Sequence, residues 1–256
     1  MTNKDIDLSV SNLHATRGKS YDIALLPWGA TEPHNLHLPY LTDAILSHDV
    51  AVDAAAIARD RSGIRSMVLP AIPLGSQNPG QREENFCIHY RQQTQESVLR
   101  DIVSSLRYQG IPRLLIVNGH GGNSFKGFIR DLAVDYPDML VGTCEWFKAA
   151  DAKAYFEAPG DHADELETSV MMHYHPELVD LTEAGAGAAN GFSGIAMRKG
   201  TGWVPRNWQK VSTDTGIGDP RTATAEKGRL FAAACADNLA MLLSDLCADD
   251  MYTHDR

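Results

Sequence analysis

Residues 23–43 of this 256-residue chain read IALLPWGATEPHNLHLPYLTD. The run at 23–26 is wholly apolar, which is typical of a strand buried on both faces of a parallel sheet. Gly29 marks the end of that strand. Four side chains of metal-ligating type follow it: Glu32, His34, His37 and Asp43. Open α/β sheets bind ligands at the carboxyl ends of their strands, so we expect a functional site at this corner.

The ligand types at this corner indicate a transition-metal site. Carboxylate and imidazole groups together suit Zn²⁺, Mn²⁺ or Fe²⁺ better than Ca²⁺ or Mg²⁺. In an extended chain Glu32 and His34 project to the same side, and Pro33 restricts the backbone between them. Asp43 has two oxygens and could bridge two ions, but at the start of a helix it could also act as a cap. A loop of unrelated surface polar residues is the alternative to a metal site.

Apolar runs and helical patterns alternate along the chain. They predict further strands at 65–74, 111–117 and 139–144, and helices at 41–59, 94–108, 125–134 and 222–246, with another helix beginning near residue 164. The predicted packing positions of the last helix are Leu230, Phe231, Ala234, Leu239, Leu242 and Leu243. Residues 183–219 are rich in Gly, Ala and Ser, which favours a lid or a subunit contact. The alternation predicts a parallel sheet covered on both faces.

Two further groups of candidate ligands follow. The strand at 111–117 runs into NGHGGN at 118–123, which places His120 at a second strand-to-helix corner. Such a turn can bind phosphate, but its spacing matches neither the dinucleotide fingerprint nor the P-loop. His162, Glu165 and Glu167 stand where a helix begins, and there acidic residues also complement the helix dipole. The polar loop at 75–81 either lines the site or forms an ordinary turn.

The composition argues against several classes of partner. A formal net charge of -10 disfavours nucleic acid or an anionic membrane. The four cysteines form no CxxC pair and lie far apart, which predicts reduced thiols in an intracellular protein. The first seven residues lack the apolar core of a signal peptide, and no stretch approaches the roughly twenty apolar residues of a membrane span. We therefore expect a soluble, cytoplasmic protein with one domain over residues 1–256.

Together the motifs resemble the creatininase family (creatinine amidohydrolases and their relatives). The family pattern Glu-x-His-Gly-x-His-Leu-Pro, followed by Thr-Asp, stands here as EPHNLHLP at 32–39 with TD at 42–43. The family's NGHGGN is present unchanged, and its HAGExETS stands as HADELETS at 162–169. GDP at 218–220 and ATAEKG at 223–228 also match the family. Asn35 and Asp164 replace family glycines.

The resemblance implies a three-layer α/β/α sandwich with a mostly parallel sheet, two adjacent divalent ions and a homo-hexamer. Glu32 and His120 would bind one ion and His34 the other, with Asp43 bridging. Creatininase takes its remaining ligand from a glutamate at the place that is Gly122 here, and Glu167 is the expected substitute. Zn²⁺ is expected first, with Mn²⁺ or Fe²⁺ as alternatives. Residues expected to orient ligands or to contact substrate are His37, Ser76, Asn118, Gly121 and Asn123.

The implied reaction is hydrolysis of a C–N amide bond in a small cyclic or formylated substrate. A water between two cations is acidified to hydroxide and attacks the carbonyl carbon, and Glu165 or His162 passes a proton to the leaving nitrogen. The departure at Gly122 argues against creatinine itself. Two alternatives stay open: a dimetal hydrolase of a lactone, ring ketone or phosphoester, and a non-enzymatic metal-binding sensor or scaffold. A phosphate substrate predicts an arginine clamp, for which Arg82 is the nearby candidate.

Overall fold

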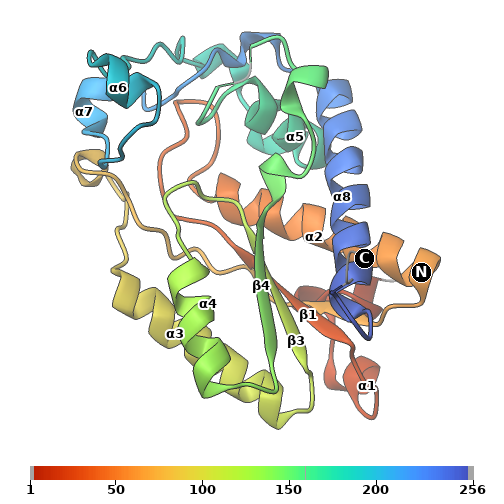
Figure 1. The fold of residues 1–256 in the computed structure, drawn as a ribbon. Helices are drawn as coiled ribbons and strands as arrows, with labels where there is room; N and C mark the ends of the chain where they lie inside the picture. The colour runs from red at the N-terminus through yellow and green to blue at the C-terminus, as the bar shows by residue number, and fades with distance from the viewer. Residues whose placement is uncertain (1–2, 159, 253–256) are drawn as a thin grey trace, which may run out of the picture.

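The computed structural model describes residues 3–158 and 160–252, and its centre is one parallel sheet in the order β2-β1-β3-β4 (Figure 1). The strands are β1 (Ile23–Trp28), β2 (Ser66–Val68), β3 (Arg113–Asn118) and β4 (Leu140–Glu145). Trp28 pairs with Asn118, so β1 and β3 end level with each other. The loops that leave these two strands therefore start side by side at the same edge of the sheet.

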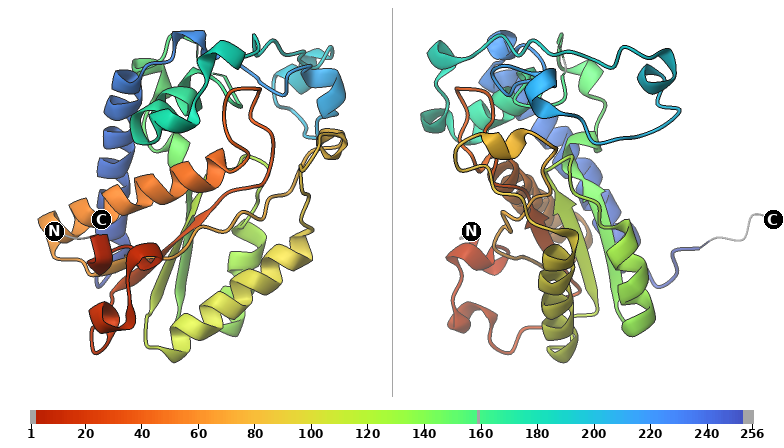
Figure 2. Two further views of the ribbon diagram at one scale, coloured as in Figure 1. Left: turned by 180° about the vertical axis from the view of Figure 1, so that it is seen from behind. Right: turned by 90° about the vertical axis from the view of Figure 1, so that its left-hand side faces the viewer.

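Helices cover both faces of this sheet, which confirms the predicted α/β/α sandwich (Figures 1 and 2). They are α1 (Leu13–Thr16), α2 (Thr42–Ser62), α3 (Gln92–Tyr108), α4 (Lys126–Asp135), α5 (Glu165–Tyr174), α6 (Ile195–Arg198), α7 (Trp208–Val211) and α8 (Ala225–Cys247). Helices α3 and α4 lie on one face of the sheet. Helices α2, α5 and α8 lie on the other.

The two hydrophobic cores follow from the alternation of side chains along the central strands. Ile23 and Leu25 of β1 pack with α2 and α8, whereas Ala24 and Leu26 pack with α3. Every residue of β1 is buried, as the continuous apolar run predicted. Burying one such leucine contributes about 1.5–3 kcal/mol, so β1 anchors both layers.

Most predicted elements are confirmed, but the strand predicted at 65–74 is wrong in length. Only Ser66–Val68 pairs with β1, and Ile72 forms an isolated bridge further on. Pro70 and Pro73 interrupt the run, and a proline cannot donate the backbone hydrogen bond that a strand needs. The chain therefore leaves the sheet early and forms a long loop beside the ends of β1 and β3.

The segment at 183–219 is irregular, as predicted, apart from the short helices α6 and α7 and one 3-10 turn, η7 (Leu181–Glu183), at its start. Residues 146–156 form two 3-10 turns, η4 (Trp146–Lys148) and η5 (Ala152–Ala154). The four cysteines are free, as expected. The opening residues Met1 and Thr2 lie outside the described residues.

Helix α8 corrects two expectations. Among the described residues, α8 is the one helix whose length and apolar composition would allow it to cross a membrane, although we expected no such stretch. Its residues Phe231, Cys235, Leu239 and Leu243 are buried in the core shared with α2 and α5, so it packs as a core helix. Leu230 was predicted to pack there too, but its side chain is 45% exposed.

Phe231 gives a direct test of this core. Its ring lies 5.1 Å from that of Phe156 and 5.5 Å from that of Tyr155, and it is fully buried. Because the substitution Phe231→Ala leaves a cavity, we expect it to lower the free energy of unfolding by about 3–5 kcal/mol in a urea titration. The neighbouring Leu230→Ala should change it by only about 0.5 kcal/mol. Equal losses from the two variants would contradict this packing.

Candidate metal centre

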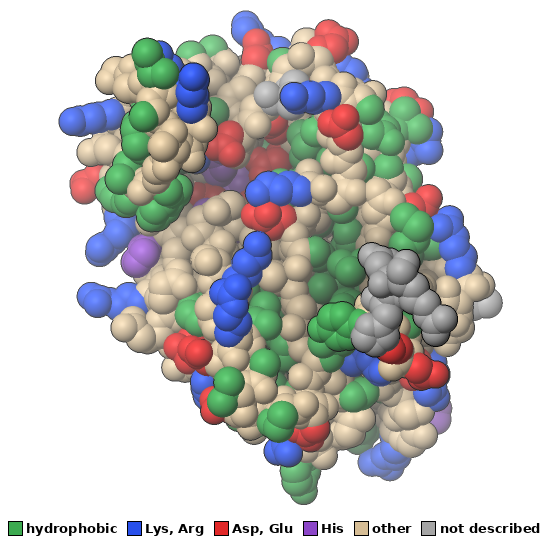
Figure 3. Space-filling view, viewed as in Figure 1, with side chains coloured by type: hydrophobic (Ala, Val, Ile, Leu, Met, Phe, Trp, Pro, Cys, Tyr) green, Lys and Arg blue, Asp and Glu red, His purple; other side chains and the backbone are tan. Residues whose placement is uncertain are grey.

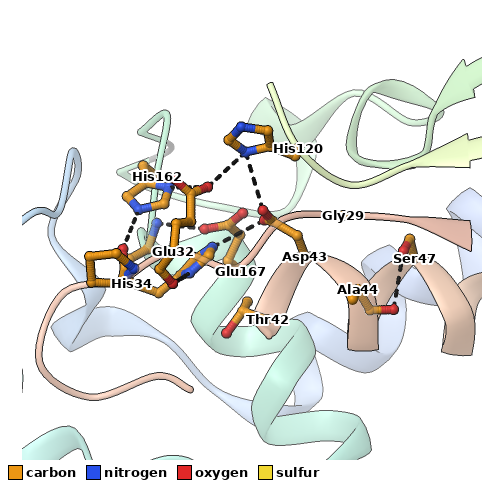
Figure 4. A network of polar contacts seen from close by, with 12 residues as sticks. Gly29, Glu32, His34, Thr42, Asp43, Ala44, Ser47, His120, His162 and Glu167 are labelled. Atoms are coloured by element: carbon orange, nitrogen blue, oxygen red, sulfur yellow. Dashed lines mark hydrogen bonds and ion pairs between the residues drawn. The ribbon is translucent and has the colours of Figure 1, made fainter. Parts of the chain in front are cut away.

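Six of the predicted site residues converge at the carboxyl edge of the sheet (Figure 4). They are Glu32, His34, Asp43, His120, His162 and Glu167. They come from the loop after β1, the start of α2, the turn after β3, and the segment that enters α5. Apart from the half-buried Glu167, none of them is more than 6% exposed.

A glycine allows these elements to meet. A Cβ atom on Gly119 would lie 2.3 Å from the carbonyl oxygen of Asp43, which no side chain could tolerate. The turn after β3 therefore rests directly on the first turn of α2. This contact carries Asp43 between the two strand ends, and its carboxylate faces His34 and His120 rather than capping the helix. The residue at the N-cap position of α2 is Leu41, whose side chain makes no capping hydrogen bond.

Asp43 is shared between two imidazoles. Its Oδ1 lies 3.1 Å from His34 Nε2, and its Oδ2 lies 3.2 Å from His120 Nδ1. Glu32 Oε1 lies 2.7 Å from the same His120 nitrogen. The ligand atoms of Glu32, Asp43 and His120 lie within 4.8 Å of one another, as do those of His34, Asp43 and Glu167. One carboxylate therefore belongs to two adjacent three-ligand groups.

A third group overlaps the first two. It consists of Glu32, His34 and His162, with His162 Nδ1 3.9 Å from Glu32 Oε1. The rings of His34 and His162 lie 4.3 Å apart between centroids and are tilted by 38° to each other. His162 therefore borders the ligand cluster directly.

Each histidine is oriented by a backbone carbonyl oxygen on its other nitrogen. His34 Nδ1 faces the Glu32 oxygen at 3.1 Å, and His120 Nε2 faces the Ser76 oxygen at 2.9 Å. His162 Nε2 faces the Pro33 oxygen at 2.9 Å. A carbonyl only accepts hydrogen bonds, so these nitrogens carry the proton, and in a neutral ring the other nitrogen offers a lone pair to the cluster. Metal-ligating histidines are held in this way.

The electrostatics of the cluster call for added positive charge. Burial lowers the pKa of His34, but the Asp43 carboxylate outweighs it and raises that pKa to about 10. Burial likewise opposes the shift at His120, yet Glu32 and Asp43 hold the pKa of His120 well above its usual value. Burial chiefly raises the pKa of Glu167 to about 8. Protons thus gather where carboxylates are buried together, and a divalent cation would satisfy the same charges.

The residues present fit a pair of cations. Asp43 Oδ2 is buried and accepts no hydrogen bond from the described residues; its contact with His120 is only an ion pair. A glutamate would not fit at position 122, where the family has one, because a Cβ atom on Gly122 would lie 2.2 Å from the Ser76 oxygen and 2.5 Å from His120 Nε2. Glu167 stands beside His34 and Asp43 instead, the position in which we expected it to replace that ligand.

The other predicted residues shape the surroundings. Asn118 bonds both the backbone N–H and the carbonyl of His120, and Asn123 donates to Gly29 O and accepts from Ser76 N. His37 Nε2 lies 2.8 Å from Thr168 Oγ1. These contacts brace the turn and the start of α5. Gly121 and Ser76 line the cavity above the cluster.

Glu165 is not brought to the cluster. Its carboxylate accepts hydrogen bonds from Lys227 Nζ at 2.6 Å and from the N–H groups of Glu157 and Ala158. Helical residues two apart point about 200° from each other, so Glu165 and Glu167 leave opposite sides of α5. The proton-transfer role expected for Glu165 does not fit this position, and its contacts favour a structural one.

A cavity of about 640 Å³ opens above the cluster. Figure 3 shows acidic and histidine side chains on the floor of this hollow, below the lobe that carries α6 and α7. Two residues of the site were not predicted from the sequence. Gln81 donates to Glu32 Oε2 at 2.5 Å, and Arg206 pairs with Asp161 at the cavity wall. Gln81 stands at the end of the polar loop at 75–81, which was the available signal for it, whereas the position of Arg206 in the 183–219 segment gave no such signal.

The creatininase (creatinine amidohydrolase) family profile matches residues 7–243. The chain belongs to the creatininase family. A mycofactocin precursor peptide peptidase from Mycobacterium ulcerans is 30% identical over 222 residues, which cover 84% of this chain and 81% of that protein. The creatinine amidohydrolase of Pseudomonas putida is 23% identical, over 85% of this chain and 87% of that protein.

Solved structures agree with this assignment. A Bacteroides fragilis protein, described provisionally as a creatinine amidohydrolase, is 55% identical with a TM-score of 0.96, covering 98% of this chain and 100% of that chain. A solved creatininase with 22% identity has a TM-score of 0.79 and covers 95% of this chain and 98% of that chain, which shows the shared fold. Relatives named amidohydrolase or peptidase are hydrolases, and this chain is a hydrolase of the family.

Binding of a cation should release protons from this cluster. Imidazolium does not ligate metals, and His34 and His120 hold their protons up to a raised pKa. Affinity for Zn²⁺ should therefore rise with pH through the neutral range and fall as pH is lowered. Titration calorimetry in buffers of different ionisation enthalpy measures the released protons. Affinity and heats that depend on neither pH nor buffer would contradict this electrostatic picture.

Glu165→Gln separates a structural role from a catalytic one. The variant loses the charged contact to Lys227, which we expect to lower the free energy of unfolding by about 1–3 kcal/mol while leaving Zn²⁺ affinity unchanged. Burial raises the pKa of Glu165, but Lys227 and the backbone donors outweigh it, so the net pKa lies below 4.5. The wild type should thus be more stable than the variant at neutral pH, and this difference in the free energy of unfolding should vanish as the pH falls through the lowered pKa of Glu165. A loss of metal affinity with no loss of stability would refute the structural role.

Proposed function

We propose that this protein hydrolyses a C–N amide bond with two adjacent divalent cations, Zn²⁺ preferred and Mn²⁺ or Fe²⁺ as alternatives. The observation that carries the proposal is Asp43, which belongs to two three-ligand groups at once. Glu32 and His120 would complete the site for one cation, and His34 and Glu167 the site for the other. Solved creatininases include a form named Zn-Zn and a form named Mn, which supports this choice of ions.

When bound, such a cation pair supplies an acidified water and polarises a carbonyl oxygen. The protein's own groups then have separate tasks. Burial, followed by the charge of His34, lowers the pKa of His162, so this ring is neutral near neutral pH. Its Nδ1 faces the cluster as a proton acceptor, because Nε2–H donates to Pro33 O. His162 can therefore take a proton and return it to the leaving nitrogen.

Trp208 shields this proton-transfer position. Its ring stands edge-on to the His162 ring at 5.5 Å and is 3% exposed. A large apolar ring on that side limits the access of bulk water, which strengthens electrostatic interactions inside the site. The guanidinium carbon of Arg206 lies over the Trp208 ring, 5.0 Å from its centroid, so the indole contacts both His162 and Arg206.

The substrate is the open part of the proposal. A small cyclic or formylated amide suits the family resemblance. A peptide bond is the second candidate, favoured by two observations. Identity is 30% to the peptidase from Mycobacterium ulcerans and 23% to the creatinine amidohydrolase of Pseudomonas putida, and the cavity of about 640 Å³ is of a size that holds drug-sized ligands. The two Trp side chains at the cavity, Trp203 and Trp208, would contact a larger substrate.

The remaining alternatives receive less support. Arg82 is exposed and does not line the cavity, and Arg206, which does, is paired with Asp161, so no free arginine clamp for a phosphoester lies among the described cavity residues. Lactone or ring-ketone opening would use the same cations. A non-enzymatic sensor fits poorly with a family of hydrolases. A cytoplasmic location and a homo-hexamer, both expected from the sequence, remain part of the proposal.

The proposal is tested with His120→Ala on a panel of creatinine, lactams, formamides, short peptides and phosphate esters. Loss of one ligand should reduce metal-dependent amide hydrolysis at least about 100-fold, because charge stabilisation of the transition state is lost. Chelation should abolish wild-type turnover, and Zn²⁺ or Mn²⁺ should restore it. The matched control is Glu177→Gln, an exposed carboxylate beside His175 and outside the cavity. A wild type inactive with every metal, or active only on phosphate esters, would sink the proposal.

A further inference from the structure

Gln81 begins the 3-10 turn η3 (Gln81–Glu83) in the loop that leaves β2. Its side chain is buried, with 1% of the residue exposed, and it reaches the ligand cluster. Gln81 Nε2 donates to Glu32 Oε2 at 2.5 Å, and Gln81 Oε1 accepts from the backbone N–H of Asn78 at 2.6 Å. A neutral amide thus contacts one of the buried carboxylates of the cluster directly.

The orientation of this amide is determined by its partners. A backbone N–H can only donate, so the oxygen of Gln81 must face Asn78 and its nitrogen must face Glu32. Both ends of the amide are then satisfied, and the side chain has no second orientation of equal energy. Glu32 Oε2 is committed to this hydrogen bond, which leaves Oε1 to face His120 at 2.7 Å.

The loop that carries Gln81 is itself held by the far wall of the cavity. The backbone N–H of Trp208 donates to Pro79 O at 2.7 Å, and the backbone N–H of Arg206 donates to Asn78 Oδ1 at 3.2 Å. Gln209 Nε2 donates to Gly80 O at 3.2 Å. Figure 1 shows this loop directly beneath α7. Asn78 therefore accepts from the 205–209 segment and donates to Gln81.

We propose that Gln81 is a positioning residue that restricts Glu32 to one-oxygen ligation and joins the cation site to the 205–209 wall of the cavity. This inference rests on the proposed two-cation function. A carboxylate with both oxygens free could chelate one ion and change its coordination number. Because Oε2 accepts from Gln81, Glu32 turns Oε1 toward His120, whereas both oxygens of Asp43 face histidines of the cluster.

The test compares Gln81→Met with Gln77→Met in the full-length protein. Met keeps the length of the side chain but cannot donate to Glu32. Gln77 lies in the same loop and is also buried, yet its amide makes no hydrogen bond among the described residues, so it controls for the chemical change. Zn²⁺ affinity is measured by competition with a chromophoric chelator, and coordination by the absorption spectrum of the Co²⁺-loaded protein.

Gln81→Met should weaken Zn²⁺ binding about 10- to 100-fold, the usual effect of removing a group that orients a ligand. Its Co²⁺ bands should lose intensity, as they do when the coordination number rises. Gln77→Met should match the wild type in both measurements. Should Gln81→Met fail to fold, Gln81→Asn carries the same test, because a side chain one methylene shorter cannot span Asn78 and Glu32.

The outcomes separate the two proposals. Wild-type affinity or an unchanged Co²⁺ spectrum in folded Gln81→Met overturns the positioning role while the cation site stands. Equal losses in Gln81→Met and Gln77→Met also overturn it, because the effect would then belong to the loop and not to the hydrogen bond. A wild type that binds neither Zn²⁺ nor Co²⁺ overturns the proposed function, and this inference with it.

Discussion

One buried carboxylate constrains the rest of this structure. Asp43 is 3% exposed and faces His34 on one side and His120 on the other. An unpaired charge in the interior is expensive, so a carboxylate buried here needs compensating groups beside it. The loop after β1 and the turn after β3 both supply them as imidazoles. The start of α2 is thereby held at the edge of the sheet where these two strands end.

The number of buried carboxylates in the cluster explains why the site suits cations. Glu32, Asp43 and Glu167 bring three carboxylates into one cluster, and the three histidines around them are anchored by backbone carbonyls. Bringing these acids together is unfavourable, and the tight packing of the two strand ends against α2 offsets it. Gly119 permits this packing because it has no side chain.

The departures from the family pattern have structural explanations. Asn35 adopts a positive φ of 53° and accepts from Gly185 N–H, while its own N–H donates to Thr215, so it ties the 183–219 segment to the ligand loop. Asp164 caps α5 by accepting from Glu167 N–H. Both polar side chains therefore hold backbone in place beside the cluster. They alter how the cluster is supported, and neither side chain belongs to the candidate ligand groups.

The sequence by itself determined the central strands, the flanking helices and the family, because continuous apolar runs and spaced ligand motifs are local properties. It overestimated β2, since the effect of Pro70 and Pro73 on pairing outweighed the apolar run. Only the tertiary structure assigned Glu165 to Lys227 and Glu167 to the cluster, although both belong to one motif. It also revealed Gln81, whose role depends on a contact with a residue 49 positions away. Hydrogen bonds between distant loops leave no periodic pattern in the sequence, so only the tertiary structure shows them.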